Sequence, residues 1–385
     1  MITIRPGSHV HTLLTILPFV GEFPMRSLHL LGSERSYKDL IRKLNQPQEF
    51  RFPDNNDRIT CRMLTVCGKG KRKTIRFYKG ALPLLERFDE YAYQYYLDAF
   101  DEHNFSGNAR HVERNHAVAE VAVMCMKAGI ESRPYDLPDV MEDYIRNLQV
   151  SNPSFFLSRE LKQVNDYELN KIRFTRLIGS IVYHGGCYAV YNTRDEGIKW
   201  LDEGESKIKY HLHQIFTPML GYDFPLRNAA VFFGASFEAA METLQTMEET
   251  YRRNKAMNPT YYNIFFVPQT EFGVRLLRVL TVYNWEERLL QALFAPADRS
   301  YNRGNFAYDA YKDGVYYLSF LSGDIWALFQ FRNAVMDRPG QFVVICYPEQ
   351  ADAVKQYIGD KAQVQTVAME QVEKYLGIEK KNLLE

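Results

Sequence analysis

The chain has 385 residues, of which 46% are hydrophobic and 14% aromatic, and these values exclude an extensively disordered protein. Its 47 Lys and Arg balance its 47 Asp and Glu, but the charges are unevenly distributed. Residues 1–90 hold 16 basic against 9 acidic side chains, a net +7, and the remainder holds 31 against 38, a net −7. We expect this internal dipole to orient a polyanion such as DNA toward the N-terminal part.

The spacing of the cysteines and the lengths of the apolar runs predict the cellular compartment. The five cysteines form no C-x-x-C pair, so they predict neither a zinc ribbon nor a disulfide framework. No stretch approaches 18 consecutive apolar residues, and the N-terminus does not follow the pattern of a signal peptide. We therefore expect a cytoplasmic protein that does not contact a membrane.

The first 45 residues predict three helices. Apolar positions indicate a first helix over residues 10–20, and Pro24 opens a second that Gly32 ends. Ser33 is a suitable N-cap for a third helix over residues 34–44. Apolar residues repeat at helical spacing in this third helix, and its polar positions on the other faces include Arg35, Ser36, Lys38, Arg42 and Lys43.

Two predicted strands, residues 58–66 and 74–78, follow the third helix and are joined by a turn of Gly and basic residues. Three helices followed by such a β-hairpin predict a winged helix-turn-helix. In this arrangement the third helix enters a major groove and the wing lies on phosphates. The predicted DNA contacts from the hairpin are Lys69, Lys71, Arg72, Lys73 and Arg76. The alternative is that the charged turn is only a solvated hairpin tip.

The composition of the chain and its turn- and linker-forming residues predict three domains. Residues 1–100 form the winged-helix domain together with a connector helix over 83–100, and residues 101–108 resemble a linker. Residues 109–282 and 283–385 each alternate helices with strands, so we expect a mixed α/β fold with a C-terminal α/β extension. No G-x-G-x-x-G or G-x-x-x-x-G-K-[ST] sequence accompanies these strands, so the sequence offers no phosphate-binding loop.

The strands and helices of the last two domains follow from runs of apolar residues. A hairpin over residues 176–192 turns at Gly185-Gly186. The other predicted strands are 155–157, 229–233, 263–267, 315–320, 342–346 and 364–367, and the predicted helices are 114–128, 199–216, 237–251, 272–279, 324–336, 351–358 and 369–376. Helices of this length between the C-terminal strands favour parallel pairing.

Several pieces together resemble the replication-relaxation family of plasmids and integrative conjugative elements. These are the wing, the helix with His116 and Glu120 four residues apart, the 158–162 tract Ser-Arg-Glu-Leu-Lys, the 175–179 tract Thr-Arg-Leu-Ile-Gly, and the Val-Tyr-Asn-Thr strand at 190–193 followed by Lys199-Trp200. The family is similar to C-type mobilisation relaxases. The resemblance implies a winged helix ahead of a restriction-nuclease-like domain of the PD-(D/E)xK type.

A nuclease of that type needs carboxylates that converge on a divalent cation, with a Lys that stabilises the developing charge. In the hairpin over 176–192 the acidic positions fall near Ile178 and Tyr191-Asn192, which supply no carboxylate. The other register uses Glu160 and Lys162 as the Glu-x-Lys, with Glu120 and Asp166 completing the cluster.

Glu120 and Glu160 are therefore the predicted ligands of Mg²⁺ or Mn²⁺ if the site is active, and Lys162 is the third predicted catalytic residue. Ser158 acting as the N-cap of a short helix is the alternative interpretation of the tract. We expect a degenerate nuclease-like domain that requires no cofactor.

The leading hypothesis is a DNA-binding protein of a mobile element that acts in replication or mobilisation. A metal-dependent DNA-nicking relaxase and a transcription regulator are the alternatives. The expected partners are double-stranded DNA, other transfer or replication proteins, and a second copy of the chain.

Overall fold

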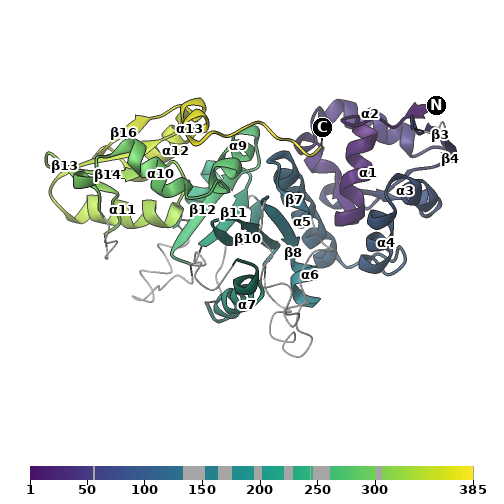
Figure 1. Ribbon diagram of the computed structural model, residues 1–385, viewed down its shortest axis with the longest axis horizontal. Coiled ribbons are helices and arrows are strands. Elements are labelled where there is room, and N and C mark those ends of the chain that lie inside the picture. The colour runs from purple at the N-terminus through teal and green to yellow at the C-terminus, as the bar shows by residue number, and fades with distance from the viewer. Residues whose placement is uncertain are drawn as a thin grey trace. The chain divides into compact units, whose positions relative to one another are not determined.

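The computed structural model describes residues 1–54, 57–132, 152–163, 176–194, 202–220, 229–242, 244–245, 261–300 and 306–384. It has a mixed α/β fold, as the sequence predicts. The chain forms two compact units, an N-terminal unit of residues 1–136 and 381–385 and a second unit of residues 137–380 (Figure 1).

Helix α1 (His9–Val20) is the central helix of the N-terminal unit and packs against α4 and α5. The Ser8 hydroxyl accepts a hydrogen bond from the His11 amide and so caps its first turn. The helix ends at Gly21, whose φ of +74° favours glycine, and a Cβ at this position would overlap the ring of Phe100. The predicted first helix is confirmed.

The two elements after α1 contain the segment predicted to be helix-turn-helix. The second predicted helix is a short 3₁₀ helix, η1 (Met25–Leu30), with non-helical backbone angles at Ser27. Helix α2 (Glu34–Leu44) has the predicted bounds, and its N-cap is Ser33, whose hydroxyl accepts from the Ser36 amide. A local capping signal was sufficient to locate this helix.

Two small sheets complete the core of the N-terminal unit. One has the order β2-β6-β5 and is antiparallel throughout; its strands are β2 (Glu22–Pro24), β5 (Leu64–Cys67) and β6 (Thr74–Phe77). The other has the order β1-β3-β4; its strands are β1 (Ile2–Thr3), β3 (Gln48–Arg51) and β4 (Arg58–Cys61). The short 3₁₀ helices η2 (Gly70–Arg72) and η3 (Lys79–Ala81) flank β6.

The single strand predicted over 58–66 is wrong, because β4 and β5 belong to different sheets. The break falls at Arg62-Met63, where the Met63 amide donates to the Leu44 carbonyl at 3.1 Å instead of to a strand. The sequence of this stretch is uniformly suited to β structure, so only the pairing partners, which are distant in the chain, separate the two strands.

The predicted connector helix is also wrong as a single helix. It consists of α3 (Leu82–Phe88) and α4 (Glu90–Ala99), separated by extended backbone at Asp89 with a φ of −158°. The Asp89 carboxylate accepts from the Ala92 amide, so an N-cap interrupts the run. The predicted linker after it carries packed rings, with Phe105 stacked on Phe100 at 5.3 Å.

Helix α5 (Ala109–Lys127) and the two-residue strand β7 (Glu131–Ser132) end the first passage of the chain through the N-terminal unit. The sequence placed α5 in the second domain, yet it packs against α1, β2 and η1. It thereby adds a buried face to the N-terminal unit, and the compact unit extends to residue 136.

The second unit contains two sheets that share one apolar core. Five of its strands have the order β12-β11-β10-β9-β8, with antiparallel pairing from β8 to β10 and parallel pairing from β10 to β12. They are β8 (Ser154–Leu157), β9 (Gly179–Tyr183), β10 (Gly186–Arg194), β11 (Ala229–Gly234) and β12 (Asn263–Pro268). The hairpin predicted around Gly185-Gly186 is confirmed as β9–β10.

The C-terminal sheet has the order β13-β14-β15-β16 and is formed by β13 (Ala310–Lys312), β14 (Val315–Ser319), β15 (Gln341–Cys346) and β16 (Ala362–Thr366). The predicted parallel pairing holds from β14 to β16, whereas β13 is antiparallel. The hydrogen bond from the Phe266 amide to the Gly323 carbonyl connects β12 to the segment between β14 and α11.

Helices of the second unit cover these sheets (Figure 1). They are α6 (Ser158–Gln163), α7 (Asp202–Leu220), α9 (Glu271–Leu280), α10 (Trp285–Leu293), α11 (Ile325–Asp337), α12 (Pro348–Ile358) and α13 (Met369–Leu376), with the 3₁₀ helix η6 (Pro296–Asp298) and helical residues 237–242. The predicted helices over 199–216, 272–279, 324–336, 351–358 and 369–376 are present, and α10 was not predicted. Of the predicted helix over 237–251, residue 243 and residues 246–251 lie outside the described residues.

Candidate nucleic-acid interface

Helix α2 presents a cationic outer face. Tyr37, Ile41 and Leu44 are buried against the N-terminal unit, and this fixes which side of the helix faces solvent. The exposed side carries the five polar residues predicted to contact DNA, namely Arg35, Ser36, Lys38, Arg42 and Lys43. The structure therefore leaves this face accessible.

The four cations of α2 are not equivalent. Lys38 Nζ lies 2.5 Å from the Glu34 carboxylate, and Arg42 Nη1 lies 2.6 Å from the Asp39 carboxylate. Among the residues that the structure describes, Arg35 and Lys43 form no ion pair. A phosphate or base edge competes with an acidic neighbour for Lys38 and Arg42 but not for Arg35 or Lys43.

The turn between β5 and β6 brings four further cations together. Gly68, with a φ of +74°, opens the turn, and a Cβ there would overlap the Arg72 carbonyl oxygen. The Lys73 amide closes it by donating to the Gly70 carbonyl at 3.1 Å. Lys69, Lys71, Arg72 and Lys73 are all exposed, and within the described part of the chain none of them pairs with a carboxylate. The turn is thus a fixed loop with four uncompensated positive charges.

Arg62 joins the end of α2 to strand β5. Its Nη2 donates to the Asn45 Oδ1 at 2.6 Å, and Asn45 is the C-cap of α2. Its Nε donates to the Leu64 carbonyl at 3.1 Å, and its guanidinium lies 4.8 Å from the centre of the Tyr78 ring. The planar fork of Arg suits this set of partners. Nothing in the sequence pattern indicates this role, because the partners of Arg62 are dispersed along the chain.

Arg76 differs from the other predicted DNA contacts. It is half-buried on β6 opposite Glu22, and its guanidinium lies over the Phe105 ring at 4.7 Å. Arg76 is only partly exposed, whereas the four cations of the turn are exposed. The structure therefore separates Arg76 from the exposed cations of the turn.

Glu22 lies on the face of the β2-β6-β5 sheet that packs against α5. Its carboxylate accepts a hydrogen bond from the Asn115 amide at 3.0 Å. Burial raises the pKa of Glu22, although the Asn115 hydrogen bond and the charge of Arg76 oppose this shift.

Glu120, predicted as a metal ligand, has protein partners in the interior of the N-terminal unit. It is 2% exposed and accepts a hydrogen bond from the Ser27 hydroxyl at 2.7 Å. Arg26 Nε lies 3.9 Å from the same carboxylate oxygen, and Arg26 Nη2 also pairs with Glu113 at 3.2 Å. The partners of Glu120 thus connect α5 to η1. His116, on the same helix, is fully buried.

Glu160 lies in the second unit, on α6. The alternative interpretation of the tract predicted a short helix with Ser158 as its N-cap; the helix is present, but Ser158 is its first residue, and Glu160 occupies its first turn. Glu160 is 4% exposed, and the Arg159 guanidinium lies 3.4 Å from it. Lys162 also lies on α6, but its side chain is outside the described residues, as is Asp166. Among the described residues, no three His, Cys, Asp or Glu side chains are grouped to hold a metal ion.

The β9–β10 hairpin carries no carboxylate anywhere from residue 176 to residue 194. Its strands are almost entirely buried, with Ile181 and Val190 fully so. The Tyr191 hydroxyl hydrogen bonds to the Tyr261 hydroxyl at 2.8 Å, and Asn192 Oδ1 accepts from the Arg194 amide. Where an acidic pair would stand, the side chains have structural partners.

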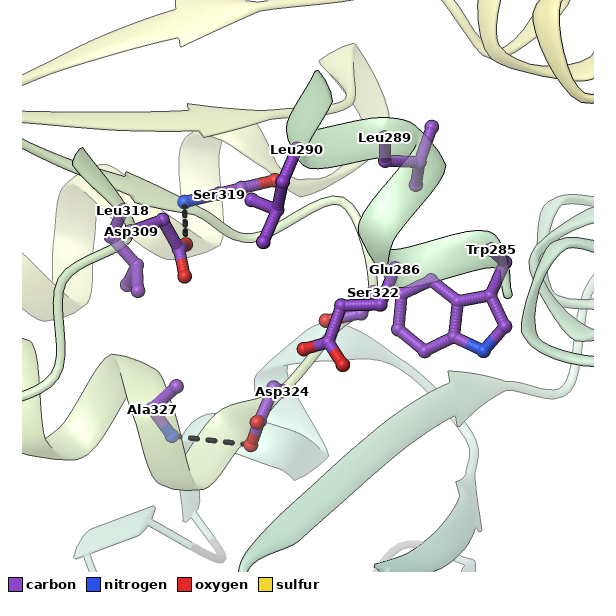
Figure 2. A pocket seen from close by; sticks show the side chains of 10 residues that line it. All are labelled: Trp285, Glu286, Leu289, Leu290, Asp309, Leu318, Ser319, Ser322, Asp324 and Ala327. Carbon is purple, nitrogen blue, oxygen red and sulfur yellow. Dashed lines mark hydrogen bonds between the residues drawn. The ribbon is translucent and has the colours of Figure 1, made fainter. Parts of the chain in front are cut away.

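A small cavity in the second unit holds acidic side chains that the sequence did not single out (Figure 2). Its volume is about 20 Å³, enough for one water molecule. Asp324 accepts from the amides of Ile264, Trp326 and Ala327, and Asp309 accepts from the Ser319 amide at 2.7 Å. These carboxylates cap α11 and fix β14, so the cavity is a structural feature of the core.

No helix among the described residues is long and apolar enough to cross a membrane. Comparison of the chain with known protein families, with curated proteins and with solved structures finds no match.

Proposed function

We propose that the chain binds double-stranded DNA through a winged helix formed by α1, β2, η1, α2, β5 and β6. The order β2-β6-β5 supports this, because it places the strand between the first two helices beside the β5–β6 hairpin, as a winged helix requires. The observation that carries the proposal is the set of four uncompensated cations at the hairpin turn, which occurs in the same unit as the exposed cationic face of α2.

In this proposal α2 enters the major groove and the turn lies on phosphates. Arg35 and Lys43 contact the DNA most strongly, because no carboxylate among the described residues competes for them. Arg62 is a positioning residue, since it fixes the C-terminus of α2 to β5 and so sets the distance between groove and phosphate contacts. Arg76 maintains the interior of the unit and does not touch DNA.

The second unit is proposed to be nuclease-like but degenerate. Strands β8, β9 and β10 form a meander, and β11 follows α7 and pairs in parallel with β10, an arrangement consistent with a restriction-nuclease-like sheet. Its central hairpin has no acid to bind a cation, which disfavours cleavage. The setting is a plasmid or an integrative conjugative element, in replication or mobilisation, as the family resemblance implies.

The test is a salt series of DNA binding by the full chain. The variant Lys69→Gln, Lys71→Gln, Arg72→Gln, Lys73→Gln should bind every duplex more weakly. Its salt slope of log K should fall by up to about 0.9 for each phosphate that the variant no longer neutralises. The matched control replaces four exposed lysines of the second unit, Lys312, Lys355, Lys361 and Lys374, with Gln. An unchanged slope in the wing variant, or an equal decrease in the control, would refute the proposal.

A further inference from the structure

The chain returns to its N-terminal unit after completing the second one. Residues 137–380 form the second unit, and Lys381 to Leu384 lie again in the N-terminal unit (Figure 1, yellow segment beside α1). The second unit is thus connected to the N-terminal unit by a segment of chain at each of its ends. The returning segment is not helical, and it is described up to Leu384.

Specific contacts hold this returning segment. The Leu383 amide donates to the carbonyl of Met126, in the last turn of α5, at 3.0 Å. The Leu384 carbonyl accepts from the Thr12 hydroxyl of α1 at 3.4 Å. Thr12 is 4% exposed and Leu384 is 5% exposed, so the segment covers its binding surface and buries an apolar side chain.

The N-terminal unit is also shaped to receive Lys381. Gly129 follows α5 with a φ of +80°, and a Cβ there would lie 3.1 Å from the Lys381 Cβ and 3.2 Å from its carbonyl oxygen. Glycine therefore permits both the helix ending and the close approach of the segment. The Lys381 ammonium lies 3.7 Å from the Glu131 carboxylate, which adds an ion pair at the first residue of the returning segment.

We propose that the surface formed by Thr12, Met126 and Gly129 is a binding site for a short peptide that ends in a turn, and that Lys381–Leu384 of the same chain occupies it. Two backbone-directed hydrogen bonds fix the direction of the peptide, the site for Leu384 selects an apolar side chain, and Glu131 favours a basic residue three positions earlier. The segment, which we call the clasp, attaches the chain that follows the second unit to the N-terminal unit. The proposal does not depend on DNA binding.

A labelled peptide of residues 378–385 tests the site in trans. Full chain carrying Leu384→Asp, whose own segment is displaced, should bind this peptide saturably. Wild-type chain should bind it at least 10-fold more weakly, because its site is filled. A peptide with Leu384→Asp should fail to bind, and a peptide with Glu379→Ala should retain binding, since Glu379 is exposed and lies outside the site.

Equal binding by the two chains, or none by either, would overturn the proposal. So would a dimer of wild-type chain that Leu384→Asp abolishes, because the segment would then occupy the site of a second copy. Hydrogen exchange on the wild-type chain gives an independent readout should the variant chain fail to fold. The Leu383 amide should exchange at least 10-fold more slowly than in the free peptide, and exchange at the free-peptide rate would refute the clasp.

Discussion

Two antiparallel hairpins of this molecule have opposite chemistry. The β5–β6 hairpin of the N-terminal unit turns through Gly68–Lys73 and exposes four cations at its tip. The β9–β10 hairpin of the second unit turns at Gly185-Gly186, buries nearly all of its strand residues and bears no acidic side chain. The first has charge that the protein itself leaves uncompensated, whereas the second has only packing partners.

The exposed charges of the first hairpin do not stabilise the fold, whereas the buried side chains of the second do. An exposed set of like charges costs the folded chain some repulsion and stabilises nothing in it, so a polyanionic partner is its simplest explanation. A buried apolar hairpin contributes to stability by packing and offers no group for metal-assisted hydrolysis. The contrast is the basis for proposing that the N-terminal unit binds DNA and that the hairpin of the second unit is structural.

The largest expected effect comes from exchanging one glycine in each hairpin for alanine. In Gly179→Ala, the new Cβ would overlap the carbonyl oxygen of Phe156, and overpacking of this kind costs about 1–3 kcal/mol. This variant should unfold at a lower temperature and bind DNA with unchanged affinity. Gly68→Ala should distort the turn through its positive φ and weaken binding to all duplexes.

Calorimetry measures the unfolding temperature of each variant, and titration with a DNA duplex measures its affinity. The titrations are made well below the unfolding temperature, so that a decrease in affinity reports on the turn and not on unfolded protein. If Gly179→Ala weakened DNA binding as strongly as Gly68→Ala does, the division of roles between the hairpins would be wrong.

The next effect tests whether Glu120 is structural or catalytic. Glu120→Ala removes the acceptor of the buried Ser27 hydroxyl and the partner of Arg26, and removal of a buried charged hydrogen bond costs about 1–3 kcal/mol. Glu120→Gln keeps an acceptor and should be destabilised less. Thermal unfolding at pH 7 measures both variants.

A DNA-nicking assay tests the opposite possibility, that Glu120 is catalytic. Supercoiled plasmid that carries candidate origin sequences is incubated with the protein in Mg²⁺ and then in Mn²⁺. We expect no nicking by wild type. Nicking that both Glu120→Gln and Glu160→Gln abolish would instead show a relaxase built on these two acids, and it would overturn the degenerate-nuclease proposal.

Local signals predicted the elements that depend on neighbours in the sequence. Helix α2 has its predicted bounds because Ser33 supplies a cap and Tyr37 and Ile41 mark its buried side. The divided strand after α2 was missed because it depends on which distant groups complete the backbone hydrogen bonds. The break at Asp89 is a local N-cap inside a continuous run of helix-forming residues, and the sequence analysis did not recognise it.

Part of the candidate site could be predicted, because some of its features depend only on residues that are neighbours in the sequence. A run of basic residues in a glycine turn is visible in sequence, so the exposed wing cations were identified. The partial burial of Arg76 and the contacts of Arg62 could not be identified from the sequence. Arg76 lies over a ring that is distant in the chain, and the partners of Arg62 are set by the folded backbone. Whether an ionic residue faces solvent or the interior is decided by tertiary packing.

Sequence discrimination by α2 should depend on which cations are free. Replacing Arg35 and Lys43 with Gln should narrow the difference between the best-bound duplex and random DNA, by about 1–3 kcal/mol for a bidentate base contact. Replacing Lys38 and Arg42, which already pair with Glu34 and Asp39, should change it less. Competition titration against random duplex measures both. An equal effect of the two double variants would show that the ion pairs open on binding.

The smallest effect is a pH dependence in the aromatic region behind the wing. The Tyr96 hydroxyl lies 2.7 Å from His103 Nδ1, and the pKa of His103 is lowered by burial and by the charges of Arg76 and Lys79. The folded protein thus binds this proton less readily than the unfolded chain. The contribution of His103 is fully present above pH 6.5 and is lost as pH falls toward the lowered folded value.

Wild type should therefore lose more stability than His103→Gln between pH 7.5 and pH 5.5, measured as unfolding temperature. Burial also lowers the pKa of His11, so His11→Gln is measured in parallel to separate the contribution of His11 from that of His103. Glu22 has a raised pKa and acts in the opposite direction, since its contribution gains as pH falls, but it is present in all three proteins and cancels in the difference. If His103→Gln and wild type lost stability equally, burial and the neighbouring charges would not lower the pKa of His103 in the folded protein, and this prediction would be wrong.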